Sequence, residues 1–162
     1  MNEDIQTETD LRGPGVQFPP PLIAFLVFGV SYAIGHYFPQ SSTGGIIAFT
    51  YLGYMLMALS LYIAVDGTVR LNRAKTNVKP NQPTTSIVET GVYRFTRNPL
   101  YLSLGILQLG LGLVLDRLTI VIGSIVFFIV VRQVAVLKEE AYLEKKFGES
   151  YLAYRERVRR WI

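Results

Sequence analysis

The chain has 162 residues, a formal net charge of +4, and a composition that is half apolar. It contains no cysteine and a single histidine, which excludes disulfides, thiolate metal sites and multi-histidine metal centres and argues against a serine–histidine triad. Because the apolar residues fall in long blocks, we predict an all-α integral membrane protein whose basic residues face lipid headgroups rather than nucleic acid.

The first 18 residues are polar and are interrupted by Gly13, Pro14 and Gly15, which predicts a mobile tail. Their acidic start lacks the basic region of a cleavable signal peptide. We therefore expect a tail over 1–18 followed by a single membrane domain over 19–162.

Four apolar stretches predict four transmembrane helices. The third begins at Pro99, which suits the first turn of a helix, and contains glycines that are common in membrane helices. The fourth should leave the hydrocarbon near Val131, because an arginine such as Arg132 at mid-bilayer would cost about 3 kcal/mol or more. The predicted spans are about 22–38, 44–65, 99–115 and 118–137.

The region after the fourth span predicts two cytosolic helical segments. The run KEEAYLEKKFG extends the span into water, with Gly148 as a helix C-cap. In the final segment, ESYLAYRERVRRWI, an apolar face formed by Tyr151, Tyr154 and Val158 opposes several arginines. This pattern is typical of an amphipathic helix lying on the membrane surface.

Basic residues predict the orientation of the spans. Six lie between Asp66 and Arg97 and eight lie from Arg132 onward, whereas the first loop has none and the loop before the fourth span has only Arg117. Basic residues concentrate on the cytosolic side of membrane proteins. We therefore predict that both termini and the long middle connector are cytosolic.

The stretch Gly91–Tyr101, GVYRFTRNPLY, is the strongest candidate for a functional site. It places two arginines, two tyrosines and an Asn-Pro pair at the start of a span. Such a group suits an anionic or polar ligand at the bilayer edge. A basic loop with interfacial aromatic residues is the alternative. Glu139 and Glu140 lie on the same predicted side of the membrane, and the sequence leaves open which of them faces the arginines.

The region from Arg73 to Ile162 resembles the isoprenylcysteine carboxyl methyltransferases and the related phospholipid N-methyltransferases. Three motifs carry the resemblance: KTNVKPNQPTTSIVETG, GVYRFTRNPLY and EEAYLEKKFGESYLAYRERVRRW. The order and spacing of these motifs are similar to those of the family. Eukaryotic members have histidine where this chain has Asn98, which puts in doubt any role that requires a protonated imidazole.

The resemblance implies S-adenosyl-L-methionine as cofactor and a set of site residues. Arg94, Arg97 and Glu139 are the catalytic candidates, and Arg132 is a candidate for binding an acidic substrate. The implied cofactor-binding residues are Thr85, Ser86, Ile87, Val88, Tyr93, Asn98, Pro99, Leu100, Tyr101 and Glu140.

We therefore predict methyl transfer to a lipidic or small hydrophobic acceptor at the cytosolic membrane face, without metal. A carboxylate acceptor needs no general base, whereas an amine must first lose a proton, to Glu139 or a tyrosine. Two alternatives remain: an NADPH-dependent membrane reductase of sterol-reductase type, and a non-enzymatic protein that binds anionic lipid.

Overall fold

A computed structural model describes residues 14–16, 18–38, 42, 44–76 and 84–162. Much of the predicted tail over 1–18, and residues 77–83 of the predicted connector, lie outside the described part of the chain. The described residues form helices and no β-strand, which confirms the all-α prediction.

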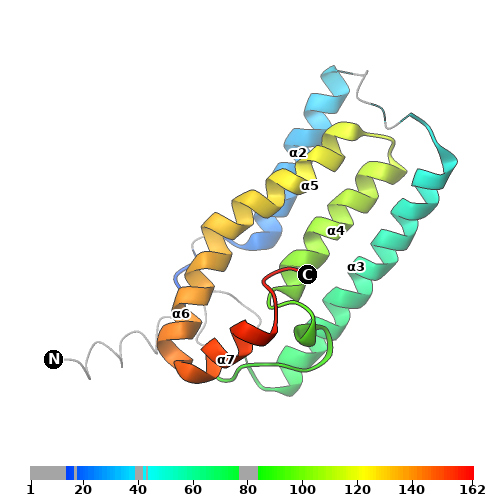
Figure 1. The fold of residues 1–162 in the computed structure, drawn as a ribbon. Coiled ribbons are helices and arrows are strands. Elements are labelled where there is room, and N and C mark those ends of the chain that lie inside the picture. Colours follow the sequence, from blue (N-terminus) through cyan, green and yellow to red (C-terminus); the bar gives the residue numbers. More distant parts are fainter. Residues whose placement is uncertain (1–13, 17, 39–41, 43, 77–83) are drawn as a thin grey trace. The chain divides into compact units, whose positions relative to one another are not determined.

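The helices follow the order predicted from the sequence (Figure 1). Three of them are long and apolar enough to cross a membrane, namely Pro20–Tyr37, Ile47–Arg73 and the continuous stretch Leu118–Phe147. The predicted third span is a helix of 16 residues, which is roughly 24 Å of helix rise. The bounds are α2 (Pro20–Tyr37), α3 (Ile47–Arg73), α4 (Pro99–Val114), α5 (Leu118–Val131), α6 (Leu137–Phe147) and α7 (Glu149–Arg157).

Two short elements complete the fold. A 3-10 helix, η1, covers Gly91–Arg94, and a π-helical stretch, η2, covers Arg132–Val136 between α5 and α6. The π-helical stretch begins at the residue where the sequence predicted that the fourth span would leave the hydrocarbon. Such stretches are rare and are frequently found at functional sites.

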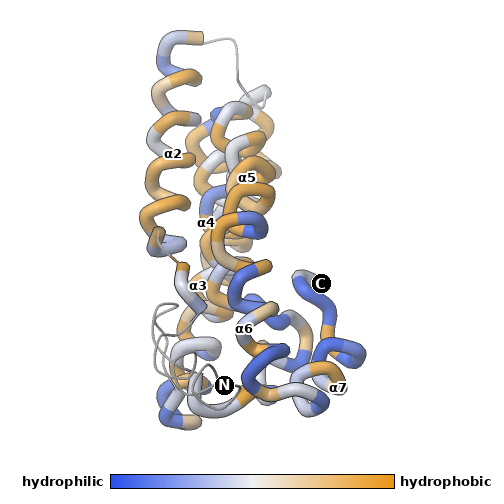
Figure 2. The backbone as a smooth tube through the Cα atoms, turned by 90° about the vertical axis from the view of Figure 1, so that its left-hand side faces the viewer, coloured by the Kyte–Doolittle hydropathy of each residue, from blue (hydrophilic) through white to orange (hydrophobic). Residues whose placement is uncertain are grey.

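The chain divides into two compact units. The apolar unit comprises Pro20–Ala64 and Leu100–Val131, and the polar unit comprises Met1–Pro19, Val65–Pro99 and Arg132–Ile162. Figure 2 shows the difference in hydropathy, with α2 and α5 mostly hydrophobic and α6 and α7 largely hydrophilic.

Close backbone contact joins α3 and α4 in the apolar unit. A Cβ atom added at Gly53 would lie 2.7 Å from the carbonyl oxygen of Gly110, and one added at Gly110 would lie 2.8 Å from the carbonyl oxygen of Gly53. The Ser60 hydroxyl also donates a hydrogen bond of 2.8 Å to the Ser103 carbonyl. Small residues thus let these helices approach closely, as in many membrane bundles.

We expect Gly53→Ala to lower the free energy of unfolding by about 1–3 kcal/mol, because the added methyl meets backbone atoms that cannot rotate away. Gly29→Ala is the matched control, since a Cβ atom at Gly29 meets nothing within 4 Å. Thermal unfolding in one detergent measures both. Equal midpoints for the two variants would contradict the close α3–α4 contact.

The other helices of the apolar unit meet through α5. A Cβ atom at Gly105 of α4 would collide with the Phe128 ring of α5. The Arg117 guanidinium, just before α5, donates a hydrogen bond of 2.8 Å to the carbonyl of Gly35 in α2. The chain turns tightly between α4 and α5, with Asp116 at a φ of 52°.

In the polar unit, α6 and α7 form a helical hairpin around Gly148. This glycine has a φ of 52° and donates its backbone N–H to the Glu144 carbonyl, which confirms the predicted C-cap. Tyr151, Tyr154 and Val158 are buried and pack with Ile87, Leu143 and Phe147. Protein therefore covers this face of α7, and the predicted position of the helix on the membrane surface stays a prediction.

Candidate functional site

The functional stretch begins with a turn held by α3. The backbone N–H of Val92 donates a hydrogen bond of 2.8 Å to Asp66 Oδ2, while Arg70 Nε donates to Asp66 Oδ1 at 3.1 Å. Gly91 adopts a φ of 62°, and a Cβ atom there would collide with the Asp66 carboxylate. Only glycine therefore suits this position, and the Asp66 carboxylate fixes where η1 begins.

The C-terminal segment is tied to the Arg-Asn-Pro turn by backbone carbonyls. Arg97 donates its backbone N–H to the Arg159 carbonyl at 3.0 Å. The Arg160 carbonyl accepts two hydrogen bonds of 3.1 Å, from Thr96 Oγ1 and from Asn98 Nδ2. Asn98 is 9% exposed, so its amide side chain holds these segments together away from solvent.

Glu140 of α6 lies between two arginines. Arg160 forms a bidentate pair with it, with distances of 2.9 Å from Nε to Oε1 and 2.7 Å from Nη2 to Oε2. Arg97 Nη2 lies 3.1 Å from Glu140 Oε1. The Arg97 and Glu140 side chains are only 8% and 10% exposed. Glu140 is therefore the buried member of the glutamate pair and lies directly beside the Arg-Asn-Pro turn.

The Arg97–Glu140–Arg160 cluster has one more positive than negative charge. Arg97 Nε is buried and has no hydrogen-bond partner among the described residues. A carboxylate can accept about four hydrogen bonds; Arg160 supplies two to Glu140, and Arg97 adds an ion pair of 3.1 Å. The cluster thus offers a buried donor and a remaining acceptor position, which together suit a ligand that has both an anionic and a cationic group.

Buried tyrosines lie next to this cluster, and Arg97 Nη1 lies 3.4 Å from the Tyr151 hydroxyl. Tyr154 donates its hydroxyl to the Tyr93 carbonyl at 2.8 Å, which joins α7 to η1. Burial, and then the Glu140 charge, raise the pKa of Tyr151 to about 12. Burial likewise raises the pKa of Tyr93 and of Tyr154.

These shifts predict a loss of stability in alkali. Because the folded state holds the Tyr151 proton more tightly than the unfolded chain does, its contribution is complete below about pH 10 and is lost as the pH rises towards about 12. Thermal unfolding at a series of pH values measures the loss, and tyrosinate absorbance follows the ionisation. Tyr151→Phe should weaken this pH dependence, and an unchanged dependence would contradict the assignment.

The segment that precedes η1 is bound to the residues just after α3 and to α6. Thr85 Oγ1 donates to the Lys75 carbonyl at 3.0 Å, and Ser86 Oγ donates to the Ala74 carbonyl at 3.3 Å. The backbone N–H of Thr84 donates to the Tyr142 hydroxyl at 3.3 Å. These contacts hold residues 84–86, and they engage the hydroxyls of Thr85 and Ser86, which the resemblance assigned to cofactor binding.

Comparison with known proteins identifies a family whose model matches most of this chain. The model of the phospholipid methyltransferase family matches residues 48–150, which include nearly all of α3, the helices α4, α5 and α6, and the site residues Arg97, Asn98 and Glu140. The chain belongs to the phospholipid methyltransferase family. It is also 41% identical to an uncharacterized protein of Haemophilus influenzae over 63 residues, which make up 39% of this chain and the whole of that protein.

The structure of this family member brings some predicted site residues together. Arg97, Asn98 and Glu140 meet through the contacts above, with the Tyr93 backbone alongside. Pro99 is buried and follows directly in the chain. Ile87 packs on the tyrosine cluster.

The remaining predicted residues differ in burial and in the unit to which they belong. Arg94 is exposed, and Arg132 is half-buried in η2. Glu139 is also half-buried, and its charge adds to burial in raising the pKa of Tyr93. Leu100 and Tyr101 belong to the apolar unit. The site roles predicted for these five residues and for Val88 remain predictions.

No role was predicted for Arg160, which pairs with Glu140 through its side chain and accepts from Asn98 through its backbone. The C-terminal arginines were predicted to form one solvated face of a helix. In the structure α7 ends at Arg157, so Arg160 lies beyond the helix and its direction does not follow helical spacing. The non-helical residues Val158–Trp161 after α7 carry Arg160, and nothing in their spacing marks it as a partner of Glu140.

Proposed function

We propose that this member of the family transfers the methyl group of S-adenosyl-L-methionine to a lipidic or small hydrophobic acceptor at the cytosolic membrane face. The observation that carries the proposal is the buried Arg97–Glu140–Arg160 cluster beside Asn98. Arg97, Asn98 and Glu140 lie within residues 48–150, which the family model matches, whereas Arg160 lies beyond them.

The residues of the cluster fit the amino-acid end of this cofactor. The unpartnered Arg97 Nε suits its carboxylate, and the remaining lone pair of Glu140 suits its ammonium group. Arg160 keeps the Glu140 carboxylate oriented, and Asn98 keeps the C-terminal segment in place. The bound cofactor supplies a methyl group on a sulfonium, and the protein mainly aligns it with the acceptor.

The cluster favours a carboxylate as acceptor over an amine. Two guanidinium groups engage Glu140, which makes it a poor general base for removing a proton from an ammonium. A carboxylate needs no proton removed, and its charge complements the excess positive charge of the cluster. Opposite charges then cancel as the new carbon–oxygen bond forms, which a dry site assists. If the acceptor is an amine, Glu139 is the candidate base.

We further propose four membrane crossings with cytosolic termini. The distribution of basic residues favours this topology, since the polar unit contains nearly all of them. In this arrangement α4 is the third and shortest crossing, and α7 lies near the headgroups through its exposed arginines rather than its buried tyrosines. A soluble cofactor and a lipid-tailed acceptor can both reach a site at this surface.

A transfer assay tests the function. Detergent-purified protein is incubated with methyl-labelled S-adenosyl-L-methionine and a membrane lipid extract, and the extracted lipid is counted before and after mild alkali. The proposal predicts label in lipid that alkali releases as methanol, because methyl esters hydrolyse. Label that stays non-volatile after alkali, in lipid or in a released headgroup, indicates N-methylation and overturns the choice of acceptor. Lipid that stays unlabelled, together with NADPH-dependent reduction, would favour the reductase alternative.

A further inference from the structure

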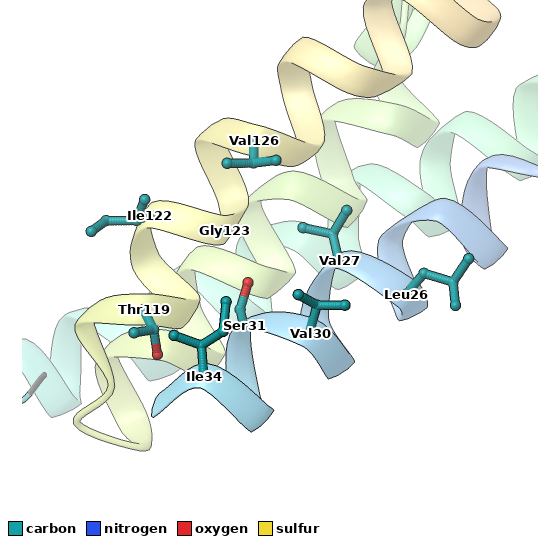
Figure 3. A pocket seen from close by; sticks show the side chains of 9 residues that line it. All are labelled: Leu26, Val27, Val30, Ser31, Ile34, Thr119, Ile122, Gly123 and Val126. Atoms are coloured by element: carbon teal, nitrogen blue, oxygen red, sulfur yellow. The ribbon is translucent and has the colours of Figure 1, made fainter. Parts of the chain in front are cut away.

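A groove between α2 and α5 is separate in its residues from the Arg97–Glu140–Arg160 cluster. It has a volume of about 510 Å³, within the size range of ligand sites. Figure 3 shows the side chains of the two helices that line it, with Val27, Val30 and Ile34 on α2 and Ile122 and Val126 on α5. Both helices belong to the stretches that can cross a membrane, so hydrocarbon surrounds this groove.

The groove is open along one side. Val30 is 59% exposed, Ile122 is 51% exposed and Val126 is 44% exposed. In a bilayer these side chains meet lipid tails, and an unfilled groove would forfeit the contacts that a chain lying in it makes. The groove therefore suits a flexible hydrocarbon chain.

Polar atoms without partners adjoin the groove. Thr119 lines it, and its Oγ1 is buried with no hydrogen-bond partner among the described residues. The same holds for both amide atoms of Gln108, which is 2% exposed. A Cβ atom added at Gly123, another lining residue, would lie 2.7 Å from Gln108 Nε2. Buried polar groups are normally hydrogen-bonded, so the Thr119 hydroxyl, which belongs to the lining of the groove, points to a ligand that has a polar group there.

The order of groups along α5 matches that of a phospholipid. Arg117 precedes the helix and is a cation, whereas the carboxylate of its neighbour Asp116 is already engaged by Ser42 and Gly45. Thr119 is the second residue of α5, and Val126 follows about 10 Å further along the axis. A phospholipid likewise presents a phosphate, then an ester carbonyl, then an acyl chain.

We propose that this groove binds one glycerophospholipid. An acyl chain lies between α2 and α5, its ester carbonyl accepts a hydrogen bond from Thr119 Oγ1, and its phosphate lies near Arg117. The site uses none of the residues assigned to methyl transfer. It therefore stands independently of the proposed function and differs from the acceptor site.

Titration of delipidated protein by native mass spectrometry tests the site. The probes are synthetic dipalmitoyl phosphatidylglycerol and its dihexadecyl ether analogue, which lacks the ester carbonyls. The wild-type protein should retain one molecule of the ester lipid and prefer it over the ether lipid about fivefold, as one hydrogen bond would give. Thr119→Val, which keeps the shape of the side chain, should abolish this preference.

Val126→Trp fills the groove and should remove the retained lipid. Ile125→Trp is the matched control, because Ile125 is 59% exposed on the same helix and does not line the groove. Equal retention by the two tryptophan variants overturns the proposal. Equal binding of ester and ether lipid by the wild-type protein also overturns it, and this test does not depend on how well either tryptophan variant folds.

Discussion

Replacing Glu140 with glutamine is expected to abolish methyl transfer and to lower the free energy of unfolding by about 3–5 kcal/mol. The carboxylate is 10% exposed and is the counter-charge of Arg97, which is 8% exposed. A neutral amide would leave two guanidinium groups facing each other. The NH₂ group of the glutamine would also face guanidinium N–H groups, which are hydrogen-bond donors as well. The cluster could therefore not keep its present arrangement.

Glu149→Gln is the control for this change. Glu149 is exposed in the first turn of α7, so its neutralisation should change the unfolding midpoint and the transfer rate little. Thermal unfolding and the labelled-methyl assay, both in the same detergent, compare the two variants. Similar behaviour of Glu140→Gln and Glu149→Gln would contradict a structural and binding role for Glu140.

Arg160→Met is expected to raise the KM for S-adenosyl-L-methionine about tenfold or more while changing kcat less than threefold. Methionine keeps most of the apolar stem but removes the two hydrogen bonds, of 2.9 and 2.7 Å, that orient Glu140. Because Arg160 is 29% exposed, we expect only about 2 kcal/mol of lost stability. Arg160 thus acts as a positioning residue.

Two further variants separate positioning from general stability. Arg160→Lys keeps the charge without the bidentate geometry, so it should restore the KM only in part. Arg159→Met removes a neighbouring exposed arginine while its backbone carbonyl still accepts from Arg97, so the KM should not change. A parallel fall in kcat and stability in Arg160→Met, with no change in KM, would contradict the positioning role.

The sequence predicted the helices well because their signals are local. Long apolar runs, Pro99 at a helix start and Gly148 at a helix end each act within a few residues, and the structure has the expected element at each place. The three motifs that carry the family resemblance are also short, local stretches of sequence. They placed Arg97, Asn98 and Glu140 in one candidate site, and the structure shows these residues in contact through Arg160.

Tertiary contacts account for what the sequence could not predict. An apolar helical face has the same spacing whether it meets lipid or protein, so Tyr151 and Tyr154 gave no sign that α7 packs on Ile87. The acceptors at Arg159 and Arg160 are backbone carbonyls, which every residue has. Which of the adjacent glutamates is buried depends on the π-helical stretch before α6, and that stretch changes the helical phase.

Calorimetric titration of the detergent-purified protein with S-adenosylhomocysteine, the product of methyl transfer, tests the central claim most directly. The Arg97–Glu140–Arg160 cluster predicts one site with affinity in the micromolar range, lost in Glu140→Gln and retained in Glu149→Gln. Absence of binding by the wild-type protein, or binding that Glu140→Gln leaves intact, would contradict the assignment of this cluster as the cofactor site.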